Sequence, residues 1–261
     1  MNAITQAPVT GCVVAVSTLF GSVFERIESW RDEVAGFAEA HSGAVTCAGI
    51  DGLVERSVVK DLASDQLSII GAGYVAEPGF IPDAHWHLAW WLGDLNTFGM
   101  GSDAPRIRRL DAIEDPTSES FRDYTTLEWW RVPTRTGLPH ITGPYVDYLC
   151  TDEYTLTLTT PVFHRDRVIG VVGADLYVED VERSLLPAMR AVGSVITLIN
   201  GSGRVVLSTD PHLATGTLLR AEGLVDALHR LDGLAGEPVS LADGRSIVGC
   251  PTGGLALVVE A

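Results

Sequence analysis

Aromatic and acidic side chains gather between residues 121 and 175 of this 261-residue chain. A cation that leaves water needs carboxylates to accept its N–H groups, or aromatic faces to supply their quadrupole. Each cation–π contact contributes about 0.5–2 kcal/mol and each charged hydrogen bond about 1.5–3 kcal/mol. The combination predicts a buried site for a positively charged nitrogen, and the candidate side chains are Tyr124, Trp129, Trp130, Tyr145, Asp147 and Asp175.

Each of these side chains also has a purely structural explanation. Trp129 and Trp130 can serve as core or interface packing, which is the commonest use of aromatic residues. Asp147 follows a Pro-Tyr pair and can accept a hydrogen bond within a turn. Asp175 lies among apolar strand residues, where a carboxylate without a partner is costly, and this favours a functional role.

Other combinations of residues are weaker candidates for chemistry. Asp83, His85 and His87 alternate, so on a strand they would share one face, as metal ligands must. The neighbouring Trp86 and Trp90 favour packing instead, and we predict no metal site. The chain has no dinucleotide fingerprint and no nucleophile elbow, so we expect neither a cofactor nor catalytic residues.

A long amphipathic helix is predicted near the N-terminus. Apolar residues recur at intervals of three and four from Val16 to Phe37, the spacing of one helix stripe. Ser17 or Thr18 can cap its start and Gly43 can end it. We call this element the spine helix and expect about 25 residues, or roughly 38 Å.

Short segments rich in β-branched and aromatic residues predict strands on both sides of a helix over 180–189, which Pro187 should interrupt. The segment 154–160 alternates leucine with threonine, which predicts one buried and one exposed face. It should form a hairpin with 168–178, at the centre of a sheet.

After that helix the pattern restarts. Asn200-Gly201 and Asp243-Gly244 mark hairpin turns, and 218–231 predicts a helix between them. The fold class is therefore α+β. A spine helix over 1–45 carries a first module over 46–190 and a smaller second module over 191–261, each an antiparallel sheet with flanking helices.

Charge and targeting signals limit the partners. Asp and Glu number 34 against 18 Lys and Arg, a net charge of -16, and such a field repels nucleic acid. Four scattered cysteines predict free thiols rather than a disulfide framework. We find no basic leader and no run of 18 apolar residues, so we expect a cytoplasmic protein with no membrane partner.

Several motifs in the first module resemble the double Cache (dCache) family of sensor domains. They are Trp129-Trp130, then Pro144-Tyr145-Val146-Asp147, a Thr-rich strand ending at Pro161-Val162, and the segment 168–175. The resemblance implies two PAS-like modules on a long helix. It also implies a ligand in the first module, held by aromatic side chains, with its ammonium on the aspartates that match Asp147 and Asp175.

The chain departs from this family at two points. Amino-acid-binding members have an arginine two residues before the Trp pair, where this chain has Leu127. Arg131 or Arg122 could replace it; otherwise the site suits an amine or a quaternary ammonium. Most relatives also carry membrane helices and a signalling domain. The chain is similar to soluble stand-alone members, which report to a separate regulatory protein and often pair through the spine helix as homodimers.

The sequence thus predicts a sensor or binding protein for a small cationic or zwitterionic metabolite: an amine, a quaternary ammonium or an amino acid. The predicted ligand-binding residues are Tyr124, Trp129, Trp130, Arg131, Tyr145, Asp147 and Asp175. Two alternatives remain. One is a small enzyme with Asp147 and Asp175 as acid and base, and the other is a protein-interaction domain without a ligand.

Overall fold

The computed structural model describes the chain with short gaps. The described residues are 3–41, 43–64, 67–96, 98, 106–147, 151–231 and 237–260. Of the four cysteines, Cys12, Cys47 and Cys250 are free thiols, and Cys150 lies outside the described residues.

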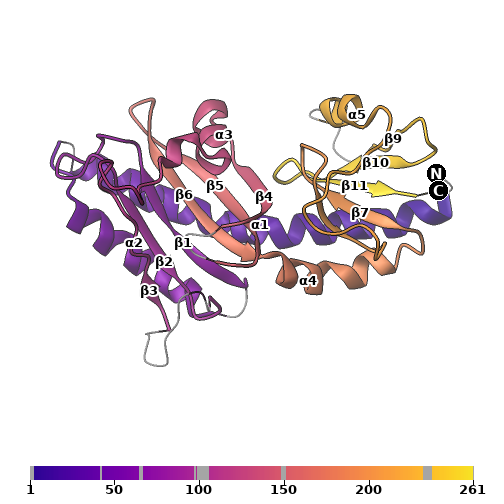
Figure 1. The fold of residues 1–261 in the computed structure, drawn as a ribbon, viewed down its shortest axis with the longest axis horizontal. Helices are drawn as coiled ribbons and strands as arrows, with labels where there is room; N and C mark the ends of the chain where they lie inside the picture. The colour runs from indigo at the N-terminus through magenta and orange to yellow at the C-terminus, as the bar shows by residue number, and fades with distance from the viewer. Residues whose placement is uncertain are drawn as a thin grey trace.

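Helix α1 (Ala3–Ala40) runs along both modules (Figure 1). Its buried stripe includes Phe20, Ile27 and Trp30. The helix begins earlier than the sequence predicts, because Val9 and Cys12 continue the same buried stripe toward the N-terminus. The predicted spine helix is therefore confirmed, but at 38 residues it is longer than expected.

The first sheet has six antiparallel strands in the order β3-β2-β1-β6-β5-β4. Helices α1 and α2 cover one face, while α3 and a short 3-10 helix, η1, cover part of the other (Figure 1). The elements are α2 (Cys47–Leu62), β1 (Ile69–Ala76), β2 (Leu88–Leu92), β3 (Arg108–Arg109), η1 (Tyr124–Thr126), α3 (Glu128–Thr136), β4 (His140–Val146), β5 (Tyr154–His164) and β6 (Arg167–Tyr177).

Strands β5 and β6 form the predicted hairpin in the interior of this sheet. Arg165 and Asp166 make its two-residue turn with φ of 50° and 62°, as a type I′ turn requires. The prediction that β5 exposes its threonines is wrong, because the strand is buried from Thr155 to Val162. One face packs on α1, and α3 covers the threonine face, where Thr159 Oγ1 donates to the carbonyl of Trp129 over 2.9 Å.

Helix α4 (Val178–Arg190) links the two modules. It continues through Pro187, so the predicted interruption is wrong. Its buried stripe of Val181, Leu185 and Met189 spans the proline and anchors both ends to the core.

The second sheet has five antiparallel strands in the order β8-β7-β11-β10-β9. Helix α5 begins at Leu224, later than predicted, because Leu218 pairs with Arg204 in a β-bridge. The elements are β7 (Ile196–Ile199), β8 (Val205–Ser208), α5 (Leu224–Leu231), β9 (Val239–Ser240), β10 (Ser246–Gly249) and β11 (Ala256–Val259). The α+β class, a long helix with two antiparallel sheets and flanking helices, is confirmed.

Candidate functional site

A cavity lies in the first module between the open face of the sheet and α3. Its volume is about 390 Å³, counted with its open mouth. Strands β1, β2, β4, β5 and β6 supply most of the floor, α3 supplies one wall, and the segment after β3 supplies another. The lining residues are Val75, Leu88, Trp90, Leu110, Trp129, Tyr145, Asp147, Thr157 and Asp175.

Asp175 forms the acidic floor of the cavity. Its side chain is buried on β6, and the Oδ1 atom accepts a hydrogen bond of 2.6 Å from Thr157 Oγ1 on β5. Tyr145 Oη lies 2.7 Å from the same hydroxyl. Because a threonine hydroxyl has a single proton, Tyr145 donates to Thr157 and Thr157 donates to Asp175. A row of hydrogen bonds thus fixes Asp175 and the Tyr145 ring.

Glycine at position 71 keeps space open beside this carboxylate. Gly71 is the β1 partner of Asp175. A Cβ atom there would lie 2.8 Å from Trp90 Nε1 and 3.4 Å from Asp175 Oδ2. A larger residue would therefore fill the floor of the cavity.

Asp147 reaches the cavity from the residue after β4. A register shift between Thr142 and Tyr145 precedes it, and such a bulge redirects the side chains that follow. Gly143 in this bulge has φ of 112°, and a Cβ there would lie 2.6 Å from the carbonyl oxygen of Thr155. Asp147 and Asp175, one from each side, give the cavity two carboxylates.

The two tryptophans of α3 have different positions. Trp129 lines the cavity and also two neighbouring pockets that share lining residues with it. Trp130 is 4% exposed and packs in the core, with its ring centroid 5.1 Å from that of Tyr124. The Tyr124 hydroxyl donates to the carbonyl of Ala76 over 2.6 Å, and burial raises its pKa. Trp130 and Tyr124 therefore support the Trp129 wall.

The two candidate arginines of the sequence analysis have different positions relative to the cavity. Arg131 is exposed and is not among the residues that line the cavity or the two pockets beside it. Arg122 lines a wider groove that adjoins the cavity, together with Tyr145 and Asp147. Arg204 of the second module lines the same groove. Sequence reasoning missed Arg204, because it is distant in the chain from the motif residues, and Thr157, because a bulge in the β5–β6 hairpin sets its place opposite Asp175.

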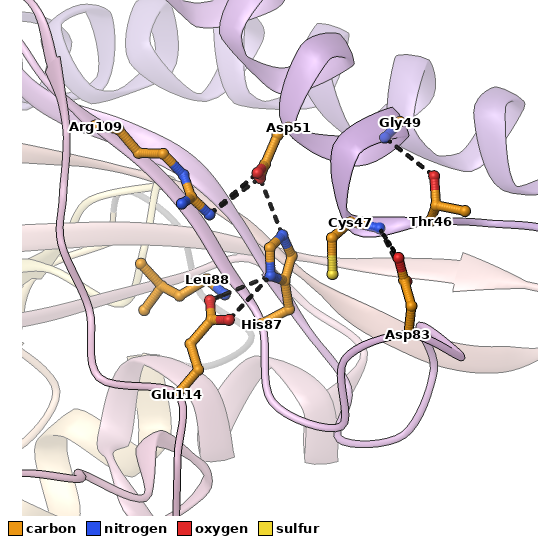
Figure 2. Close-up of polar contacts among 9 residues, drawn as sticks. All are labelled: Thr46, Cys47, Gly49, Asp51, Asp83, His87, Leu88, Arg109 and Glu114. Atoms are coloured by element: carbon orange, nitrogen blue, oxygen red, sulfur yellow. Dashed lines mark hydrogen bonds and ion pairs between the residues drawn. The ribbon is translucent and has the colours of Figure 1, made fainter.

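A charged cluster holds the segment after β3 in place (Figure 2). His87 is 2% exposed, with Nε2 3.0 Å from Asp51 of α2 and Nδ1 3.1 Å from Glu114. Burial alone would lower the pKa of His87, but the hydrogen bonds to Asp51 and Glu114 raise it from 6.5 to about 9. Arg109 also pairs with Asp51 over 3.2 Å. The cluster thus positions the wall that contains Leu110.

The alternating Asp83, His85 and His87 do not converge. Asp83 accepts a hydrogen bond from the backbone N–H of Cys47 (Figure 2), and the His85 ring packs edge-on against Trp86. Within the described ranges, no three His, Cys, Asp or Glu side chains are grouped to hold a metal ion.

Comparison with known proteins identifies the first module. Residues 57–183 match the family model of the methyl-accepting chemotaxis protein-like, first PDC sensor domain. No match was found among curated protein sequences.

Solved structures share the fold over nearly the whole chain. A methyl-accepting chemotaxis protein X has a TM-score of 0.63 and 18% identity, covering 98% of this chain and 96% of that one. The periplasmic sensory domain of a Campylobacter jejuni chemoreceptor has a TM-score of 0.59 and 12% identity, covering 95% and 89%. The ligand-binding domain of a Pseudomonas fluorescens chemoreceptor, in complex with L-valine, has a TM-score of 0.57 and 14% identity, covering 98% and 95%.

The prediction of a cytoplasmic protein is wrong. The solved domain of the Campylobacter jejuni relative is periplasmic. In this chain, the part of α1 from Ala7 to Ala40 is long and apolar enough, by length and composition, to cross a membrane, with mean hydropathy 1.7. Its apolar residues are interspersed with small and polar ones, so a search for an unbroken apolar run overlooks it.

Proposed function

We propose that this chain, which is a dCache-type sensor domain and not an enzyme, binds the protonated amine of a small metabolite between Asp147, Asp175 and the ring of Trp129. The ligand would be an amine or an amino acid. The L-valine complex of the Pseudomonas fluorescens relative supports the amino-acid class, and the periplasmic relative supports a position outside the cytoplasm.

The observation that carries this proposal is the charge of the cavity. Two carboxylates line a mostly apolar cavity, and none of the described residues that line it is basic. Mostly apolar surroundings strengthen the attraction between these carboxylates and a positively charged ligand, because the local dielectric constant is low. An ammonium group supplies both the charge and the N–H donors.

The aromatic wall favours the same ligand. Trp129 borders the cavity beside Asp147, and an indole face attracts a cation by about 0.5–2 kcal/mol.

Ligand binding can be tested by isothermal titration with L-valine, isobutylamine and isobutyrate. The amine and the amino acid should bind, whereas isobutyrate should not. Asp175→Asn should weaken both by about tenfold to a hundredfold, because a charged hydrogen bond contributes about 1.5–3 kcal/mol. The amide oxygen can still accept from Thr157, so the fold should be retained.

Asp166→Asn is the matched control. It makes the same substitution in the same hairpin, at an exposed turn position with φ of 62°, which asparagine tolerates. Its ligand affinity should equal that of the wild type. Binding of isobutyrate alone, or full affinity in Asp175→Asn, would refute the amine site.

A further inference from the structure

The wide groove beside the cavity lies between the two modules. The first module contributes Arg122 and the end of β4, and the second contributes the β7–β8 turn with Arg204. Tyr145 and Asp147 line both this groove and the amine cavity. A ligand whose amine lies in the cavity could therefore extend into the groove.

Both arginines have donors to spare. Arg204 Nη1 donates to the carbonyl of Gly216 over 2.5 Å, and Arg122 Nη1 donates to the carbonyls of Glu119 and Phe121. No carboxylate of the described residues forms an ion pair with either guanidinium. Each guanidinium has five N–H groups, so both retain positive charge and free donors toward the groove.

The nearest acidic groups of the groove are already engaged. Glu128 lies 2.9 Å from His140 Nε2, and this hydrogen bond lowers its pKa, with smaller contributions from Arg131 and Arg204. Asp123 accepts from the backbone N–H and the hydroxyl of Thr125. Arg122 and Arg204 are the basic side chains among the described residues that line this groove, and they can receive an anion there.

Asn200 fixes Arg204 relative to the cavity. Its Nδ2 donates to the carbonyl of Gly143 over 2.6 Å, a buried contact to the strand that carries Tyr145. Its Oδ1 accepts from the backbone N–H of Arg204 over 2.9 Å. A single side chain thus ties the residue that carries the guanidinium to the wall of the amine cavity, and this reduces the entropy lost on binding.

We propose that the ligand is zwitterionic and that its carboxylate enters this groove, where Arg204 of the second module and Arg122 of the first contact it. This inference rests on the amine site proposed above. Arginine suits the role because its planar fork matches a carboxylate. The ligand would then contact both modules at once.

The test compares two ligand pairs that differ only in the carboxylate: L-valine with isobutylamine, and 4-aminobutanoate with propylamine. Isothermal titration measures all four on the wild type and on Arg204→Gln. Arg204→Gln should weaken at least one amino acid by about tenfold to a hundredfold and leave its amine partner unchanged. Arg204→Lys, which keeps the charge without the fork, should recover part of the loss.

Arg230→Gln on α5 is the control, an exposed arginine of the same module that lines none of the described pockets. It should bind every ligand as the wild type does. Equal weakening of acid and amine in Arg204→Gln, or no weakening of either, would overturn this inference while the amine site stands. A wild type that binds none of the four would overturn both proposals.

Discussion

Replacing His87 by glutamine should destabilise the protein most at mildly acidic pH. The imidazole is buried between Asp51 and Glu114, and its pKa rises from 6.5 to about 9. A group whose pKa is raised on folding stabilises the protein fully below its unfolded pKa, and this contribution is lost as the pH rises through the folded pKa.

The size of the effect follows from that change in pKa. Raising the pKa from 6.5 to about 9 corresponds to about 3 kcal/mol of unfolding free energy. The two carboxylates are about 30% exposed, and screening by water reduces the expected contribution to about 2 kcal/mol. A chain of this size loses about 2–4 °C per kcal/mol, so the melting temperature should fall by about 4–8 °C.

Protonation of Glu114 sets the lowest pH at which the ion pair with His87 still stabilises the fold. Burial raises its pKa, but the hydrogen bonds from His87 and the backbone N–H of Leu88, with the charges of His87 and Arg109, together outweigh this and lower the pKa from 4.5. Its contribution is therefore present above pH 4.5 and is lost as the pH falls through the folded pKa. The difference between wild type and variant should be largest between about pH 5 and 6.5 and should vanish above pH 9.

Thermal unfolding followed by circular dichroism at pH 5.5, 7, 8 and 9.5 measures this difference. His212→Gln, at an exposed position of the second module, serves as control and should change the melting temperature little at any of these pH values. A loss in His87→Gln that is the same from pH 5.5 to 9.5 would refute the ion-pair reasoning and leave only the packing of the ring.

Two further predictions concern the walls of the cavity and the contact between modules. Trp130→Ala should lower the unfolding free energy by about 3–5 kcal/mol in urea, as expected for a buried aromatic residue, whereas Trp129→Ala should mainly weaken amine binding in titration. Gly253→Ala should destabilise the protein by about 1–2 kcal/mol, because Gly253 has φ of 70° and an added Cβ would lie 2.2 Å from Ile141 Cδ1. Wild-type stability in Gly253→Ala would show that the two modules tolerate separation there.

Local patterns in the sequence predict most of the elements, because they reflect contacts between residues a few positions apart. The stripe of α1 and the hairpin of β5 and β6 follow from periodicity and from a two-residue turn. The failures arise where a distant part of the chain decides the outcome. The threonines of β5 are buried because α3, some 25 residues earlier in the chain, covers them.

The β5 residue that pairs with Asp175 cannot be found by counting from the hairpin turn, because one inserted residue shifts the pairing of the two strands. Counting back from the pair of His164 and Arg167 places Leu156 opposite Asp175. A bulge between Val162 and Phe163 shifts the register by one residue, so Thr157 takes that place and its hydroxyl reaches the carboxylate. Bulges carry weak sequence signals, and the hydrogen-bond row of the cavity therefore could not be predicted.

The positions of the arginines also depend on parts of the chain that are distant in sequence. Arg131 is close to the tryptophans in the chain, but one helix cannot direct every side chain to the same face, and Arg131 is exposed. Arg204 is some 70 residues away and comes beside the cavity through the second module. Proximity in sequence thus predicted that Asp147 and Asp175 line one cavity and that Arg122 lies beside it, but it could not predict Arg204, which lies across the module boundary.

The position of β4 connects ligand binding to the rest of the molecule. Its end carries Tyr145 and Asp147 at the cavity, while Gly143, two residues before Tyr145, accepts the buried hydrogen bond from Asn200 of the second module. Loss of this buried hydrogen bond would be destabilising by about 1–3 kcal/mol. The contact therefore favours a fixed position of the second module relative to the strand end that carries Tyr145 and Asp147.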